Sequence, residues 1–198
     1  MRARRTTERG FTIVELLTVI AVIGILVAAA APSFIHLLRD RRVDDAARTI
    51  ADIYRTARAR ALGRGAAIVV QFDDSAAGGN HFQILEAVTG PADPLSPVLP
   101  VSSCSSANFR VVTAFDERSA RYAPAAARFK DPFGATLSSA AVCFSPRGTA
   151  FIGAAVGGPM ARMNGVPRVD VTNTFDGKAR AVIIPPTGGA RVVSRVVP

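Results

Sequence analysis

The sequence that decides the fold spans residues 11–31, which read FTIVELLTVIAVIGILVAAAA and carry a single charge, Glu15. At about 1.5 Å per residue, a helix of this length spans about 32 Å, the thickness of one bilayer core. Four arginines precede the segment, whereas residues 39–45 beyond it carry no net charge. Because Lys and Arg favour the cytoplasmic side, we expect the N-terminus to stay inside and the body to be extracytoplasmic.

The acid Glu15 bears on how this segment is used. A cleaved secretory signal is one interpretation, since residues 28–30 are small alanines that suit a signal peptidase. A permanent membrane anchor is the second. Neither a cleaved signal nor a permanent anchor needs an acid. Placing a carboxylate at the centre of a membrane helix costs up to about 2.5–3.5 kcal/mol of insertion free energy. The third interpretation is that Glu15 has a partner, and its alternative is a glutamate that reaches the interface.

Residues 9–17, RGFTIVELL, resemble the class III leader of type IV pilins and type II secretion pseudopilins. In that family a prepilin peptidase cuts after the glycine, the new N-terminal phenylalanine is N-methylated, and a glutamate is the fifth mature residue. The resemblance implies cleavage between Gly10 and Phe11 and methylation of Phe11. It also implies that Glu15 pairs with the Phe11 amine of a neighbouring subunit, an attraction that offsets the desolvation of both charges.

The chain beyond the leader (residues 1–10) and the membrane helix (11–31) divides into two further parts. Residues 32–63 continue the helix as an amphipathic segment, because Pro32 can bend a helix without ending it. Gly63 and Gly65 then stop it. On the solvated side we expect ion pairs between Asp44 and Arg48 and between Asp52 and Arg55. The apolar stripe that faces the core comprises Val43, Ala47, Ile50, Tyr54, Ala57 and Ala61.

Residues 64–198 change towards a period of two, which is typical of strands. The predicted strands are residues 66–72, 81–85, 109–114, 140–144, 168–174, 179–184 and 190–196. Asp176-Gly177 predicts a hairpin turn between two of them. No βαβ alternation is present, so we predict an antiparallel sheet and an α+β fold, with the long helix packed on the sheet.

An irregular loop is expected at residues 86–108, where prolines recur every third position from Pro91 to Pro100 and suggest a polyproline II edge. Cys104 lies in this loop, and Cys143 lies in a predicted strand. The extracytoplasmic location permits a disulfide between them. Two separate buried thiols are the alternative.

The body also resembles the GspH/FimT pseudopilin domain in three segments. Residues 58–70 are similar to its helix-to-first-strand junction, residues 143–150 to its Phe-x-Pro-x-Gly turn, and residues 181–188 to its closing strand and glycine turn. With the leader, the resemblance covers nearly the whole chain and implies a minor pseudopilin or pilin.

The charge pattern raises a second function. The formal net charge is +9, and residues 118–198 alone contribute +8. Some FimT-like minor pilins bind DNA through a C-terminal Gly-Arg-x-Arg segment, whereas residues 188–191 here read GGAR, so that the first arginine is replaced by glycine. The candidate DNA contacts are Lys178, Arg180, Arg191 and Arg195. A basic surface that only aids solubility is the alternative.

Catalysis is not expected. Two Cys and two His are too few for a zinc knuckle or an iron–sulfur site, and the chain lacks a Gly-x-Ser-x-Gly elbow, a His-Glu-x-x-His motif and a phosphate loop. We therefore predict no cofactor and no metal. The expected role is a structural subunit of a type II secretion system or type IV pilus, with prepilin peptidase and other pilins as partners. It would lie in the bacterial inner membrane, with its body in the periplasm, before it joins a filament.

Overall fold

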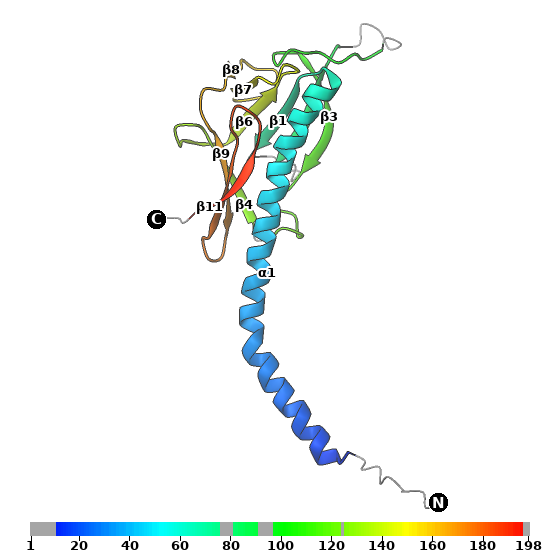
Figure 1. Ribbon diagram of the computed structural model, residues 1–198, viewed down its shortest axis with the longest axis vertical. Helices are drawn as coiled ribbons and strands as arrows, with labels where there is room; N and C mark the ends of the chain where they lie inside the picture. The colour runs from blue at the N-terminus through cyan, green and yellow to red at the C-terminus, as the bar shows by residue number, and fades with distance from the viewer. Residues whose placement is uncertain (1–10, 76–80, 91–96, 124, 196–198) are drawn as a thin grey trace, which may run out of the picture. The chain divides into compact units, whose positions relative to one another are not determined.

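The computed structural model describes residues 11–75, 81–90, 97–123 and 125–195. The chain divides into two compact units, with the boundary between Leu38 and Arg39. The fold is α+β, as predicted: a long helix runs through both units, and two antiparallel sheets belong to the second (Figure 1).

Helix α1 (Ile13–Arg64) continues through Pro32 without a break. It ends at Arg64, one residue beyond Gly63, and Gly65 adopts a φ of +67°, a left-handed conformation that glycine tolerates after a helix. Both the continuation beyond Pro32 and the stop near Gly65 were predicted from the sequence.

The predicted apolar stripe of α1 is buried in the second unit. Its six residues are Val43, Ala47, Ile50, Tyr54, Ala57 and Ala61, and none is more than 4% exposed. The predicted pair between Asp52 and Arg55 is present, with Oδ1 and Nη1 2.8 Å apart. The predicted Asp44–Arg48 pair is wrong: Asp44 instead accepts a hydrogen bond from Arg180, which the fold brings next to it.

Two sheets form the body. The six-stranded sheet has the order β3-β2-β1-β6-β7-β8, and the five-stranded sheet has the order β11-β10-β9-β4-β5. The first contains β1 (Ile68–Asp73), β2 (Phe82–Val88), β3 (Asn108–Phe115), β6 (Ser139–Phe144), β7 (Ala150–Gly153) and β8 (Ala161–Arg162). The second contains β4 (Ala125–Lys130), β5 (Thr136–Leu137), β9 (Arg168–Asn173), β10 (Ala179–Ile183) and β11 (Arg191–Arg195).

The main core combines apolar side chains from α1 and from both sheets. In β1, Val70 and Phe72 belong to this core, while Val69 belongs to a second cluster that contains Leu85 and Cys143. Alternate residues of a strand point to opposite faces, so β1 is covered on both sides. This explains why the strand starts with three successive apolar residues, Ile68 to Val70, instead of alternating from the start.

Each of the seven predicted strands corresponds to an observed strand, although residue 196 of the last lies outside the described residues. The sequence missed β4, β5, β7 and β8, of which β5 and β8 have two residues each. The unpredicted β4 reads AAARFK, which is poor in β-branched residues. One sheet was predicted and two are present, because local periodicity does not determine which strands pair.

The irregular loop overlaps the ends of β2 and β3, and Val88 forms a β-bridge with Pro100. Pro91 and Pro94 lie outside the described residues, and so does that part of the polyproline II prediction. Cys104 and Cys143 form a disulfide that joins the loop to β6, with an S–S distance of 2.04 Å.

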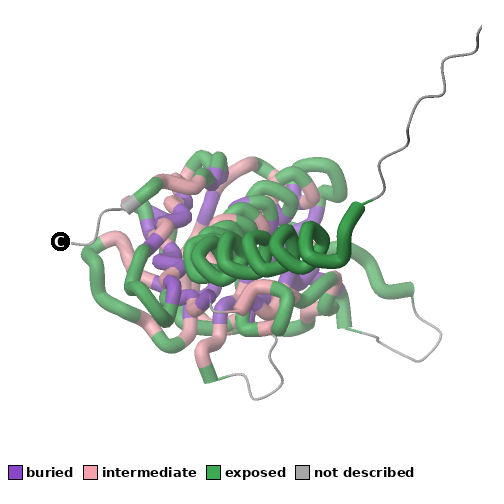
Figure 2. Tube along the Cα trace, turned by 90° about the horizontal axis from the view of Figure 1, so that it is seen from below, coloured by how far each residue is buried: buried purple, intermediate pink, exposed green. Residues whose placement is uncertain are grey.

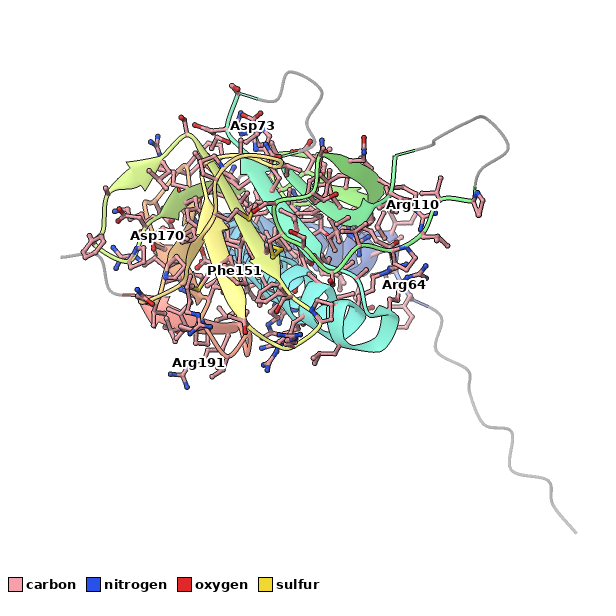
Figure 3. The ribbon with its side chains drawn as sticks, turned by 90° about the horizontal axis from the view of Figure 1, so that it is seen from above. Arg64, Asp73, Arg110, Phe151, Asp170 and Arg191 are labelled. Atoms are coloured by element: carbon pink, nitrogen blue, oxygen red, sulfur yellow. A yellow bond between two sulfur atoms is a disulfide. The ribbon has the colours of Figure 1, made fainter. Side chains whose placement is uncertain are left out.

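A buried carboxylate ties the end of α1 to the six-stranded sheet. Glu86 of β2 is 1% exposed and accepts hydrogen bonds from Arg64 at 2.7 Å and from Arg110 of β3 at 2.8 Å (Figure 3). Burial by itself would raise the pKa of Glu86, but the hydrogen bonds and positive charges of Arg110 and Arg64 hold it below its usual value.

The three segments that resemble the GspH/FimT domain meet around one side chain, Arg58 of α1. A Cβ atom added to Gly148, in the turn after β6, would lie 3.6 Å from Nη2 of Arg58. A Cβ atom added to Gly188, in the turn after β10, would lie 2.2 Å from Cδ of Arg58. The Arg58 side chain therefore depends on glycine at position 188 for its space.

Replacing Glu86 with glutamine should destabilise the protein by about 1–3 kcal/mol near neutral pH, because two arginines lose their carboxylate. The wild-type stabilisation is complete above the unfolded pKa of about 4.5 and is lost as the pH falls through the lower folded pKa. The difference in the free energy of unfolding between wild type and Glu86→Gln should therefore become smaller as the pH falls below the unfolded pKa, as measured by urea titrations of the full chain in detergent. A difference that stays the same at low pH would contradict this. Asp52→Asn, which removes an exposed pair, is the control and should change stability by at most about 0.5 kcal/mol.

Three alanine substitutions separate backbone strain from the contact with Arg58. Gly189→Ala should be nearly neutral, since its Cβ meets nothing within 4 Å. Gly177→Ala should cost about 1–2 kcal/mol, because φ is +71° with no neighbour. Gly188→Ala combines a φ of +74° with the contact to Arg58 and should cost more. In an Arg58→Ala background the cost of Gly188→Ala should fall to that of Gly177→Ala in thermal unfolding. If Gly188→Ala lowers stability by the same amount in wild type and in Arg58→Ala, the contact with Arg58 does not account for its cost.

Candidate functional site

The predicted cleavage point lies just before α1 begins. Gly10 is outside the described residues, while Phe11 is 82% exposed and precedes the helix together with Thr12. The hydroxyl oxygen of Thr12 accepts a hydrogen bond from the backbone N–H of Glu15 at 3.2 Å. Thr12 is therefore the N-cap, and it satisfies one of the backbone donors that every helix leaves free at its start.

Glu15 lies in the first turn of α1 and is exposed. With Thr12 it makes the pattern Thr-x-x-Glu, a capping-box sequence that favours a helix start at this point. A carboxylate here also interacts favourably with the positive end of the helix dipole. Within the described residues no cation pairs with its side chain. The capping pattern was visible in the sequence and is an additional reason for an acid at this position.

The N-terminal part of α1 is an apolar surface with nothing packed on it in this single chain. Every residue from 11 to 38 is exposed, as the green turns of the helix in Figure 2 show. Contiguous apolar surfaces of this extent are rare on soluble monomers. Among the described residues, α1 is the one helix long and apolar enough to cross a membrane, judged by length and composition.

The four candidate DNA contacts do not form one free basic patch. Lys178 donates to Asp40 of α1 at 2.7 Å and also pairs with Asp176 at 3.3 Å. The hydrogen bonds that Lys178 donates to the carboxylates of Asp40 and Asp176 raise the pKa of Lys178. Arg180 pairs with Asp44 of α1. These two cations hold the β9–β10 hairpin to the helix.

The other two candidates belong to β11. Arg191 is exposed, and Figure 3 shows it on a different side of the body from Arg64 and Arg110. Arg195 ends the same strand, but its side chain is not among the described ones. The sequence showed a basic excess, yet it did not show that acids of α1 already neutralise part of it.

Comparison with known proteins adds one finding. Residues 5–31 match the family model described as the prokaryotic N-terminal methylation motif. No curated protein and no solved structure matches the chain. The matched segment contains Gly10, Phe11 and Glu15, and the apolar helix that follows fits membrane anchoring. The match therefore supports a type IV pilin-like structural subunit, whose leader motif implies processing by prepilin peptidase and assembly with other pilins.

Proposed function

We propose that the chain is a minor pseudopilin or pilin of a type II secretion system or a type IV pilus. Prepilin peptidase cuts between Gly10 and Phe11, and Phe11 is then N-methylated. The mature subunit waits in the inner membrane with its body in the periplasm, and later joins a filament through its apolar helix. The observation that carries this proposal is that Glu15, the one acid among the exposed residues 11–38, lies in the first turn of α1 and within the matched segment.

The proposed pair between the Phe11 amine and Glu15 can form only in the mature chain. Cleavage removes a leader of net charge +3 and creates an amine on Phe11, which is largely protonated at neutral pH given a reference pKa of about 7.7–8.0. In a low-dielectric environment this cation and the Glu15 carboxylate of a neighbouring subunit attract each other strongly. The pair offsets the desolvation that each group would suffer alone, and it sets the axial register of one helix against the next.

The choice of the GspH/FimT group rests on the body. The three segments of the resemblance come from different parts of the chain, and the turns at Gly148 and Gly188 both lie next to Arg58 of the first segment. Such an arrangement supports a common structural unit, since unrelated short matches have no reason to meet. DNA binding receives less support, because Lys178 and Arg180 pair with acids of α1.

The test must separate inter-subunit pairing from helix capping. Glu15→Gln removes the charge but keeps a side chain that suits a capping box. Thr12→Ala weakens the cap by about 1 kcal/mol and keeps the charge. Glu15→Gln and Glu15→Ala should leave leader cleavage intact and reduce incorporation into sheared filaments at least tenfold. Thr12→Ala should assemble close to wild type.

The readout is the ratio of filament-bound to membrane-bound subunit in the native host. Normal incorporation of Glu15→Gln would contradict the pairing model. The pairing model would also be contradicted if Glu15→Ala and Thr12→Ala reduce incorporation while Glu15→Gln does not, because helix capping would then explain the requirement for Glu15.

A further inference from the structure

One polar cluster in the body is not used by the proposed function. His81 directly precedes β2, and Asp116 and Glu117 directly follow β3. These strands are antiparallel with Phe82 opposite Phe115, so the start of one and the end of the other share an edge of the sheet. The pairing brings one ligand atom from each of His81, Asp116 and Glu117 within 4.8 Å of one another.

Two members of the cluster are almost completely buried. His81 is 1% exposed and Glu117 is 0% exposed, and Nδ1 of His81 lies 2.8 Å from Oε1 of Glu117. The same oxygen also accepts a hydrogen bond from the backbone N–H of Ala127 in β4, at 3.4 Å. The second oxygen, Oε2, is buried without a hydrogen-bond partner among the described residues. A buried carboxylate oxygen without a partner is costly, so this atom favours the binding of a positively charged ligand.

Two further acids, Asp73 and Asp74, lie near the cluster. The backbone N–H of Asp73, which is labelled in Figure 3, donates to the carbonyl of His81 at 3.0 Å. The one arginine at this edge with a described ion pair, Arg118, is paired with Asp74. Asp116 is only partly buried and gives the cluster access to solvent.

We propose that His81, Asp116 and Glu117 bind a divalent transition-metal ion of the Zn²⁺ class. One imidazole nitrogen and two carboxylates are ligands that zinc accepts, whereas Ca²⁺ prefers oxygen ligands alone. Zinc bonds of about 2.0–2.2 Å in a tetrahedral arrangement place ligand atoms about 3.4 Å apart, so the three atoms need to move by about 1 Å or less. Water fills the fourth position.

The ion has a structural consequence. Glu117 already contacts β4 of the five-stranded sheet through Ala127, while His81 belongs to the edge of the six-stranded sheet. A bound metal joins these groups and satisfies Oε2 of Glu117. Counting Cys and His in the sequence missed the site, because two of its three ligands are carboxylates.

The full chain in detergent, stripped with EDTA and kept oxidised, is titrated with Zn²⁺ and followed by calorimetry and thermal unfolding. A hundredfold excess of Zn²⁺ over its Kd should raise the Tm by about 5–10 °C. Asp116→Asn, at a partly buried position, should still fold and bind Zn²⁺ at least tenfold more weakly. Glu117→Gln should also lose the shift. His36→Gln and Asp52→Asn are controls outside the cluster and should bind like wild type.

Three outcomes would overturn the proposal. They are the absence of a Tm shift in wild type, an equal shift in Asp116→Asn, and an equal shift with Ca²⁺ in place of Zn²⁺. If Glu117→Gln does not fold, the comparison between wild type and Asp116→Asn still decides the matter.

Discussion

Moving the Glu15 carboxylate out of water is the constraint on which the account of this chain depends. The residues around it are apolar and exposed from 11 to 38, so this part of the helix needs lipid or other helices to cover it. A carboxylate is tolerated there if a cation comes with it, and in the proposed function removal of the leader supplies a new amine four positions before the acid. In the proposed function the leader and the acid belong to one mechanism, in which cleavage creates the charge that assembly then buries.

The C-terminal half of α1 is part of the second unit and is packed in its core. The apolar stripe from Val43 to Ala61 is buried in a core shared with both sheets. Ion pairs hold this half of α1 at two levels: Asp40 and Asp44 contact Lys178 and Arg180, and Arg64 contacts Glu86. Because Arg58 also lies against two turns, the helix and both sheets depend on one another for their positions.

Local patterns in the sequence predicted the parts of the fold that depend on local physics. The spacing of three and four identified the buried stripe, the change to a period of two identified seven strands, and Gly65 marked the end of the helix. Long-range pairing was beyond such reasoning. Nothing local indicated that Asp44 would meet Arg180, that the strands would divide into two sheets, or that His81 would lie beside Glu117.

For the candidate site, the sequence alone located Glu15, since its signal is an acid inside an apolar run. The Thr12 cap was visible as Thr-x-x-Glu but was not recognised from the sequence. The basic C-terminal residues were overvalued, because a net charge does not reveal which cations already have acidic partners.

The most direct measurement of the central claim is the intact mass and N-terminal sequence of the protein extracted from the membranes of its native host. The account predicts a mature chain that begins at N-methylated Phe11 and retains the whole apolar helix. A protein that keeps residues 1–10, or one that begins near Ala31, would contradict it, because Glu15 could then never meet the amine of a processed Phe11.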